Sequence, residues 1–278
     1  MSNPVITKEW NIGGNKTILL NRTYIMGILN VTPDSFSDGG NYSDVEHAVT
    51  RAYEMKEQGA DIIDVGGQST RPGHTPISSG EEWSRIAPVL RRLCADRELV
   101  ISVDTYYPDV ARKAMECGAH IINDVTGFRD PIMRQYAAFY GAGCVIMHDI
   151  PFAEDDDVCS ELIRFFRIRT EECIADGIKR EKICLDPGVG FGKSYGQNLT
   201  IAKKFGSLCF DQYPMLAAAS RKRVIGISCG NPPANERMPG TIAYHTACIL
   251  GGANLIRVHD IHEAVQAARV ADAVKAIE

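Results

Sequence analysis

Three polar side chains stand at the ends of short apolar runs that lie far apart in the sequence. Asp104 ends LVISVD, Asn123 lies in HIIND, and Asp186 ends KICLD. A buried carboxylate is costly unless it is paired, so each acid needs a partner. Together, two carboxylates and an amide suit a flat, nitrogen-rich heterocycle with ring N–H groups or a guanidine-like edge. The structural alternative is that each side chain caps the following loop in an Asx turn.

Cationic groups follow other apolar runs: Arg71 in STRPG, Lys222 in SRK, and Arg257 and His259 in RVHD. The formal net charge of -5 argues against broad binding to nucleic acid or anionic membranes, so an anionic ligand must be held by local cations. Arginine pairs bidentately with phosphate oxygens, which favours a phosphate or pyrophosphate. Asn30 ends the first apolar run and could orient a phosphate oxygen or a metal ion. We expect Mg²⁺ between two phosphates, because it keeps several waters and takes few protein ligands.

Eight apolar runs carry these polar ends, and the runs are short and do not alternate with polar residues. Such runs are typical of strands buried on both faces of a parallel sheet. The first is 24–29, and the others lie in DIIDVGGQSTR, LVISVD, HIIND, CVIMH, KICLD, PMLAAASRK and NLIRVHD. Helical patterns alternate with them at about 45–59, 80–95, 108–117, 131–141, 157–177, 197–206, 240–251 and 261–277.

This alternation predicts a single (β/α)8 TIM barrel, in which the carboxyl ends of all strands converge on one mouth. The polar strand ends can then form one site. We expect one domain over residues 1–278, because the short returns argue against a second. Residues 1–20, with a GGN turn between VITKEW and KTILL, predict a hairpin that caps the bottom of the barrel. Glycines stand where helices should stop, namely Gly59, Gly118, Gly141, Gly177 and Gly251.

Other kinds of site are disfavoured by residue spacing. The nine cysteines are at least eleven positions apart, which fits neither zinc nor a secreted disulfide pattern, so we expect mostly buried free thiols. DPGVGFGKS is not a phosphate-binding loop, because Pro187 takes the place of its first glycine, and GxGxxG fails at Lys193. The remaining glycine-rich turn should bring Phe191 near the ligand. His259 and His262 lack an evident third ligand, so zinc is not expected.

The first residues, MSNPVITKEW, do not form a basic segment followed by a long apolar run. No apolar stretch approaches the roughly 20 residues that a membrane span needs. We therefore expect a cytoplasmic protein.

The motifs resemble those of the dihydropteroate synthase family of pterin-binding TIM barrels, in their order and at their spacing. They are NVTPDSFSDGG, the GG-STRPG pattern over 66–73, SVDTY, INDVTG, LDPGVGFGK, ASRK and RVHD, which span the chain from about residue 24 to the end. The resemblance implies condensation of 6-hydroxymethyl-7,8-dihydropterin pyrophosphate with p-aminobenzoate, giving 7,8-dihydropteroate and pyrophosphate in folate biosynthesis. It also implies Mg²⁺, a homodimer, and a p-aminobenzoate subsite of the kind that sulfonamides target, because they mimic p-aminobenzoate.

The resemblance further implies a role for individual positions. Pterin would be bound by Asp104, Asn123, Met147, Asp186, Phe191, Lys222 and Arg257. Pyrophosphate would be bound by Asn30, Arg71, Arg257 and His259, with Asn30 also at the metal. p-Aminobenzoate would lie against Phe36, Thr70, Pro72 and Arg223. The catalytic residues would be Asp38, Arg71, Asp104 and Lys222. Segments 32–40 and 69–73 resemble two mobile loops that close over the site.

The chain departs from the family pattern in three places. Arg223 replaces a serine that is common after the SRK lysine, and Gln68 replaces the glutamate of GGESTRPG. The stretch MHDIPFAEDDD is shorter and more acidic than the usual MHMxGxP loop. A guanidinium at position 223 could pair with the p-aminobenzoate carboxylate in place of the serine hydroxyl.

Two alternative functions stay open at this point. One is a pterin-binding methyltransferase that passes a methyl group from a methyltetrahydrofolate to a corrinoid. It shares the barrel and the acidic residues but does not need NVTPDSFSDGG, SRK or RVHD. The other is a non-catalytic pterin-binding paralogue, which Arg223 and the altered fifth loop keep open.

Overall fold

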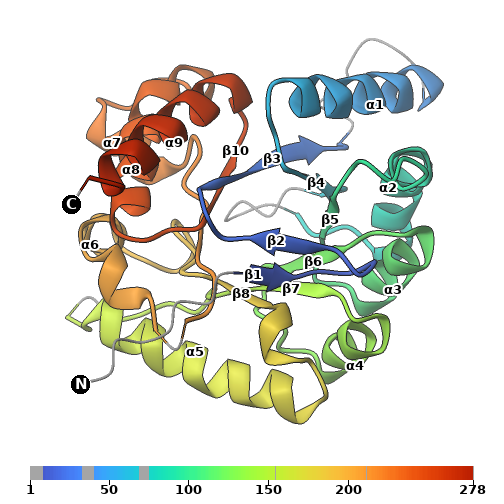
Figure 1. The fold of residues 1–278 in the computed structure, drawn as a ribbon, viewed down its shortest axis with the longest axis horizontal. Helices are drawn as coiled ribbons and strands as arrows, with labels where there is room; N and C mark the ends of the chain where they lie inside the picture. The colour runs from blue at the N-terminus through green and yellow to red at the C-terminus, as the bar shows by residue number, and fades with distance from the viewer. Residues whose placement is uncertain (1–8, 33–40, 69–74, 154, 211, 278) are drawn as a thin grey trace.

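Eight parallel strands form a nearly closed barrel with helices around it, as the sequence predicts (Figure 1). The computed structural model describes residues 9–32, 41–68, 75–153, 155–210 and 212–277. The barrel strands are β3 (Tyr24–Asn30), β4 (Ile62–Gly66), β5 (Ile101–Asp104), β6 (Ile121–Asp124), β7 (Gly143–Met147), β8 (Ile183–Asp186), β9 (Leu216–Ala217) and β10 (Leu255–Val258). Neighbours pair in the order β8-β7-β6-β5-β4-β3-β10-β9. A parallel bridge between Leu185 and Met215 joins the two ends of this sheet.

The eight helices predicted from the sequence are all present. They are α1 (Asn41–Glu57), α2 (Ser79–Leu93), α3 (Pro108–Cys117), α4 (Pro131–Tyr140), α5 (Val158–Ala175), α6 (Tyr195–Lys203), α8 (Met238–Leu250) and α9 (Ile261–Lys275). The pattern does not predict α7 (Arg223–Ser228), because six residues are too few to show a helical period. Short 3₁₀ turns lie at Arg180–Lys182, Phe205–Leu208 and Ala234–Glu236.

Local signals explain where the helices begin and end. α3 and α4 each start with a proline, whose missing N–H is not needed in the first turn. They stop at Gly118 and Gly141, which have left-handed φ angles of 103° and 60°. At the end of α8 the expected stop, Gly251, is the C-cap but has a φ of -77°, and the left-handed residue is Gly252 with a φ of 110°.

A small antiparallel hairpin closes the end of the barrel where the strands begin. It consists of β1 (Glu9–Asn11) and β2 (Thr17–Leu19). Trp10, Ile12 and Ile18 pack against residues from seven barrel strands, among them Met26 and Ile62. The Trp10 indole Nε1 also donates to Lys182 O at 2.8 Å. This end of the barrel is therefore an apolar plug.

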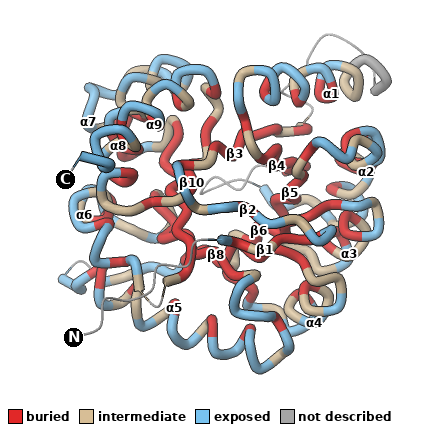
Figure 2. The backbone as a smooth tube through the Cα atoms, in the orientation of Figure 1, coloured by how far each residue is buried: buried red, intermediate tan, exposed pale blue. Residues whose placement is uncertain are grey.

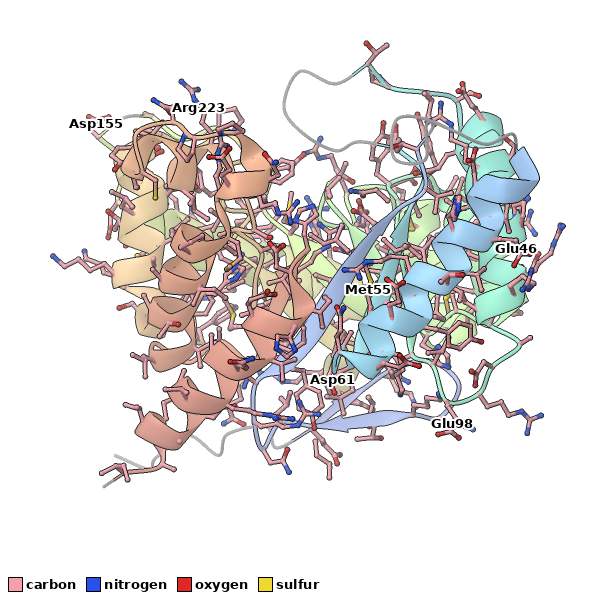
Figure 3. All side chains as sticks on the ribbon, turned by 90° about the horizontal axis from the view of Figure 1, so that it is seen from above. Glu46, Met55, Asp61, Glu98, Asp155 and Arg223 are labelled. Atoms are coloured by element: carbon pink, nitrogen blue, oxygen red, sulfur yellow. The ribbon has the colours of Figure 1, made fainter. Side chains whose placement is uncertain are left out.

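The opposite end of the barrel carries the loops that follow the strands. Figure 3 shows Asp61 and Glu98 near the hairpin, whereas Arg223 and Asp155 lie at the far end. Buried residues follow the strands and the helix faces turned toward them (Figure 2). Most of them belong to one apolar cluster between sheet and helices, which includes Ile63, Leu90, Phe166 and Ile256. Polar strand ends can therefore meet only at the mouth that the hairpin leaves open.

The nine cysteines are all free thiols, and five of them are buried, as the sequence predicts for most. Cys209 and Cys229 are exposed. Among the described residues, none of the helices combines the length and the apolar character that crossing a membrane requires.

The plug gives a test of what closes the barrel. Replacing Trp10 with Ala removes a side chain that is 0% exposed, and should lower the free energy of unfolding by about 3–5 kcal/mol. Urea denaturation measures this loss. Leu19→Ala is the matched control on the same hairpin, because Leu19 is 54% exposed and its loss should change stability by no more than about 0.5 kcal/mol. Equal effects of the two changes would contradict the plug.

Candidate active site

A half-buried arginine joins two buried acids at the centre of the barrel mouth. Arg257, on β10, donates from Nε to Asp64 Oδ2 at 2.6 Å and from Nη2 to Asp104 Oδ2 at 2.5 Å. Asn123, at the end of β6, donates from Nδ2 to the same Asp64 oxygen at 3.0 Å. Side chains from β4, β5, β6 and β10 thus form one connected network. The structure brings Asp104, Asn123 and Arg257 together, and it adds Asp64.

Each of the two acids keeps one oxygen without a partner. Asp64 Oδ1 and Asp104 Oδ1 are buried and accept no hydrogen bond from the described residues. A buried acceptor in this state costs about 1–3 kcal/mol, so it favours a ligand that donates. Burial raises the pKa of Asp104 to about 7, although the neighbouring Arg257 lowers it. The centre therefore offers acceptors to ring N–H groups.

Asp186 and Lys222 lie beside this network and act on each other electrostatically. The Asp186 Oδ1 accepts from Gly188 N at 2.7 Å, so this acid also caps its own loop, as the Asx alternative predicts. Burial raises the pKa of Asp186, while the nearby Lys222 lowers it. Burial lowers the pKa of Lys222 to about 8, while Asp186 raises it. The ammonium donates to Val189 O at 2.7 Å.

The glycine-rich turn after β8 places an aromatic ring beneath this lysine. Lys222 Nζ lies 4.6 Å from the centroid of the Phe191 ring, within the range of a cation–π contact. At Gly188, which has a φ of 66°, a Cβ would lie 1.9 Å from His148 O. Only glycine allows the turn to approach β7 this closely. Met147, at the end of β7, is buried beside the same turn.

The structure brings together some of the residues that are expected to bind pyrophosphate. The His259 ring Nδ1 lies 2.9 Å from Ser220 Oγ, so the RVHD and SRK stretches meet. Asn30, half-buried at the end of β3, is on the neighbouring strand. The Arg257 guanidinium pairs with Asp64 through Nε and with Asp104 through Nη2, so its Nη1 group remains for an anion.

Arg223, where the family commonly has a serine, lies at the start of a short helix. It is exposed at the first position of α7 and forms no hydrogen bond or ion pair that involves the described residues. Its neighbour Arg221 instead pairs with Asp260. Five further expected site residues, Phe36, Asp38, Thr70, Arg71 and Pro72, lie outside the described residues.

A buried acid below Asp104 is absent from the sequence-based site. Glu82, on α2, is 0% exposed and accepts from Thr105 Oγ1 at 2.6 Å and from Gln68 Nε2 at 3.4 Å. Burial raises the pKa of Glu82 to about 7. Because Thr105 follows Asp104 directly, Glu82 anchors the backbone next to the acidic centre. The sequence signal that could have identified Glu82 is the position of this charged residue on the apolar face of an amphipathic helix.

Two metal types can be compared with the residues present. No group of three or more His, Cys, Asp or Glu side chains that could hold a metal ion occurs within the described part of the chain. His262 is exposed, and its ring Nε2 lies 2.7 Å from Gln266 Nε2. Mg²⁺ bound mainly through substrate phosphates needs few protein ligands, and the Asn30 amide oxygen is a suitable one.

Comparison with known proteins gives a consistent result. A family model for pterin binding enzymes matches residues 26–259. The dihydropteroate synthase of Clostridium beijerinckii is 43% identical over 274 residues, which cover 96% of this chain and 97% of that protein. The Xanthomonas albilineans dihydropteroate synthase with 4-aminobenzoic acid has a TM-score of 0.91 and 40% identity, covering 98% of this chain and 99% of that one. The Xanthomonas albilineans dihydropteroate synthase in complex with 7,8-dihydropteroate has a TM-score of 0.89 and 38% identity. That match covers 97% of this chain and 100% of that one.

The buried Glu82 carboxyl predicts a pH-dependent stability. The folded state holds its proton up to about pH 7, whereas the unfolded chain loses it near pH 4.3. The stability that Glu82 contributes is therefore fully present below about pH 4 and is lost as the pH rises through about 7. Between about pH 5 and about pH 8, the unfolding free energy of the native protein should fall by roughly 2–3 kcal/mol relative to Glu82→Gln. Urea denaturation at both pH values measures the difference, and a constant or rising difference would refute it.

Proposed function

The chain belongs to the pterin-binding enzyme family and, within it, to the dihydropteroate synthases, and we propose that the residues of its barrel mouth divide the work of that reaction as follows. The enzyme is a transferase that condenses 6-hydroxymethyl-7,8-dihydropterin pyrophosphate with p-aminobenzoate, and it releases pyrophosphate and 7,8-dihydropteroate. The one domain over 1–278 and the cytoplasmic location expected from the sequence are part of the proposal.

The observation that carries the assignment is the pair of unpartnered oxygens on Asp64 and Asp104. A pterin presents ring and amino N–H groups along one edge, and these are the donors that the two acids lack. Asn123 orients Asp64, and Asp186 lies on the other side with Lys222. Met147 and Phe191 supply the apolar walls against which a flat ring packs.

The charges at the mouth suit the bond that breaks. The bond between the pterin methylene carbon and a pyrophosphate oxygen breaks, and the positive charge left on that carbon is delocalised into the pterin ring. The carboxylates of Asp104 and Asp186 stabilise that charge where it develops. The arylamine nitrogen then bonds to the carbon and loses a proton to water. An arylamine is weakly basic, so its attack needs no strong general base.

The leaving pyrophosphate takes the cationic side of the mouth. His259, Arg257 and Arg71 are the groups that would bind its oxygens. Mg²⁺, when bound, would neutralise charge on the two phosphates, and Asn30 would be its ligand from the chain. We assign Asp38, Arg71, Asp104 and Lys222 as the catalytic residues.

The p-aminobenzoate subsite is proposed at Phe36, Thr70 and Pro72, with Arg223 as the partner of the carboxylate. The exposure of Arg223 leaves its guanidinium free to reach an anion at the rim. Sulfonamides mimic p-aminobenzoate and would compete at this subsite.

A homodimer is also proposed. Exposed apolar side chains stand on α8 and α9, among them Leu250, Val270 and Val274, and a twofold-related copy would cover them. The methyltransferase and paralogue alternatives are disfavoured, because relatives that match nearly the whole chain are dihydropteroate synthases.

Turnover tests the function directly. Purified protein with Mg²⁺ should release pyrophosphate only when the dihydropterin pyrophosphate and p-aminobenzoate are both present, because the arylamine must trap the methylene carbon. A coupled pyrophosphate assay measures the release, and a sulfonamide should slow it in competition with p-aminobenzoate. Release equal to the blank in the presence of both substrates would exclude the synthase activity.

Pterin affinity tests the assignment of Asp186 and Lys222. Lys222→Ala and Asp186→Asn each remove a charge-assisted contact worth about 1.5–3 kcal/mol, so each should weaken dihydropterin pyrophosphate binding by roughly 10–100-fold. Calorimetry measures the affinity, and the melting temperature should stay nearly unchanged because the asparagine still accepts from Gly188 N. Asp124→Asn is the matched control, since Asp124 is a buried strand-end acid that caps its own turn through Thr126 and Phe128. Unchanged affinity in both variants would remove these residues from the pterin site.

A further inference from the structure

One ammonium group lies behind the pterin-binding turn and has no part in the chemistry proposed above. Lys193 Nζ lies 2.9 Å from His148 Nδ1, 2.9 Å from Phe191 O, 3.0 Å from Gly188 O and 3.2 Å from His148 O. An ammonium carries three protons and no acceptor, so these four acceptors use its whole hydrogen-bonding capacity. Two acceptors belong to the residue after β7, and two belong to the turn after β8.

The two segments approach each other closely around this ammonium. A Cβ at Gly188 would lie 1.9 Å from His148 O, and a Cβ at Gly192 would lie 2.7 Å from Pro151 N. Phe152 N donates to Gly192 O at 3.2 Å. Several carbonyl oxygens therefore converge in a small volume, where they repel one another unless a cation stands among them.

The turn that Lys193 holds also holds the pterin-site lysine. Val189 O, within the turn, accepts from Lys222 Nζ at 2.7 Å, and the Phe191 ring lies 4.6 Å from the same ammonium. Asp186 Oδ1 accepts from Gly188 N at 2.7 Å, so the acid is tied to the turn as well. A shift of the turn would move both members of the Asp186 and Lys222 pair.

The state of the histidine fits this arrangement. Burial lowers the pKa of His148 to about 3, so its ring is neutral at working pH. We assign Nδ1 as the acceptor of the Lys193 proton, which places the ring proton on Nε2. The ring stacks on Phe152 with centroids 4.4 Å apart, and Phe165 meets it edge-on. Burial lowers the pKa of Lys193 to about 7, while Asp186 raises it.

We propose that Lys193 is a positioning residue for pterin binding, whose ammonium clamps the end of β7 to the turn after β8 and thereby places Lys222 and Asp186. This proposal rests on the pterin-binding function proposed above. It also gives a use to the GFGK stretch, which lacks the spacing of a phosphate-binding loop. The lysine binds carbonyl oxygens of its own chain in place of phosphate oxygens.

The first measurement is the affinity of Lys193→Met for 6-hydroxymethyl-7,8-dihydropterin pyrophosphate, with Mg²⁺ and without p-aminobenzoate. Methionine keeps much of the length of the side chain but removes the ammonium. Calorimetry should show binding at least about tenfold weaker than in the native protein. Lys16→Met is the matched control, because Lys16 is also half-buried and donates to two backbone carbonyls, Arg97 O at 2.6 Å and Leu99 O at 3.0 Å, at the hairpin end. That variant should bind within about twofold of the native protein.

The second measurement separates positioning from a purely structural role. Lys222→Ala is made in the native and in the Lys193→Met background. If Lys193 places Lys222, the loss of affinity caused by Lys222→Ala should be at least about tenfold smaller in the Lys193→Met background than in the native one. The reason is that Lys222 is no longer held in place in that background. A general loss of stability would lower the melting temperature but leave the fold-loss for Lys222→Ala the same in both backgrounds.

The outcomes are distinct. No binding by the native protein would refute the proposed function itself. If the native protein binds and Lys193→Met binds with the same affinity, the positioning role alone is overturned. The same holds if Lys222→Ala weakens binding equally in both backgrounds. If Lys193→Met does not fold, Lys193→Arg decides, because a planar guanidinium keeps the charge but does not fit a compact cage of four acceptors. It should bind at least about threefold more weakly, and native affinity would refute the clamp.

Discussion

The contact of one guanidinium with two buried carboxylates sets the conditions for the rest of the barrel mouth. Arg257 reaches both Asp64 and Asp104, and each acid gives it only one oxygen. Charges removed from water are tolerated when they are paired and hydrogen-bonded, and here the pairing is incomplete. The mouth is therefore short of donors before any ligand arrives. The other features of the mouth surround these two acids and their missing donors. They are the polar strand ends, Lys222 and the turn after β8.

The barrel divides stability and chemistry between its two ends. Trp10 and its apolar neighbours fill the hairpin end. At the other end the strands stop in Asp104, Asn123 and Asp186, and burial raises the pKa of the two carboxyl groups above the ordinary range. Groups with such shifts are unfavourable for folding and useful for recognition. The plug at one end offsets the cost that the mouth imposes at the other.

Much of this arrangement could be predicted from the sequence, because its signals are local. Apolar runs of strand length, each followed by a helical pattern and many by a glycine, specify a barrel, and in a barrel all strand ends meet. Asp104, Asn123 and Asp186 could be chosen because each stands where a run stops. Asp64 escaped notice because it lies inside its run, and its partner Arg257 is distant in the chain.

What could not be predicted depends on contacts between loops. From the sequence, Lys193 is only the residue at which a GxGxxG motif fails. Nothing in the sequence shows that the segment after β7 folds over it. Glu82 looked like one more acid in the first turn of α2. The sequence pattern also does not show that a short helix begins at Arg223 or that its side chain is exposed. Side-chain direction at a helix start is a property of the packed structure.

The shortest described strand of the barrel lies between Asp186 and Lys222 in the chain. β9 has two residues, and a single bridge joins Leu185 to Met215 across the seam between β8 and β9. Asp186 ends β8 on one side of the seam, and Lys222 follows β9 on the other side. A ligand that contacts both side chains therefore links the two strands, between which the short β9 makes few backbone hydrogen bonds. Ligand affinity and the cohesion of the barrel are therefore linked at that point, since whatever binds only the closed wall also favours its closure.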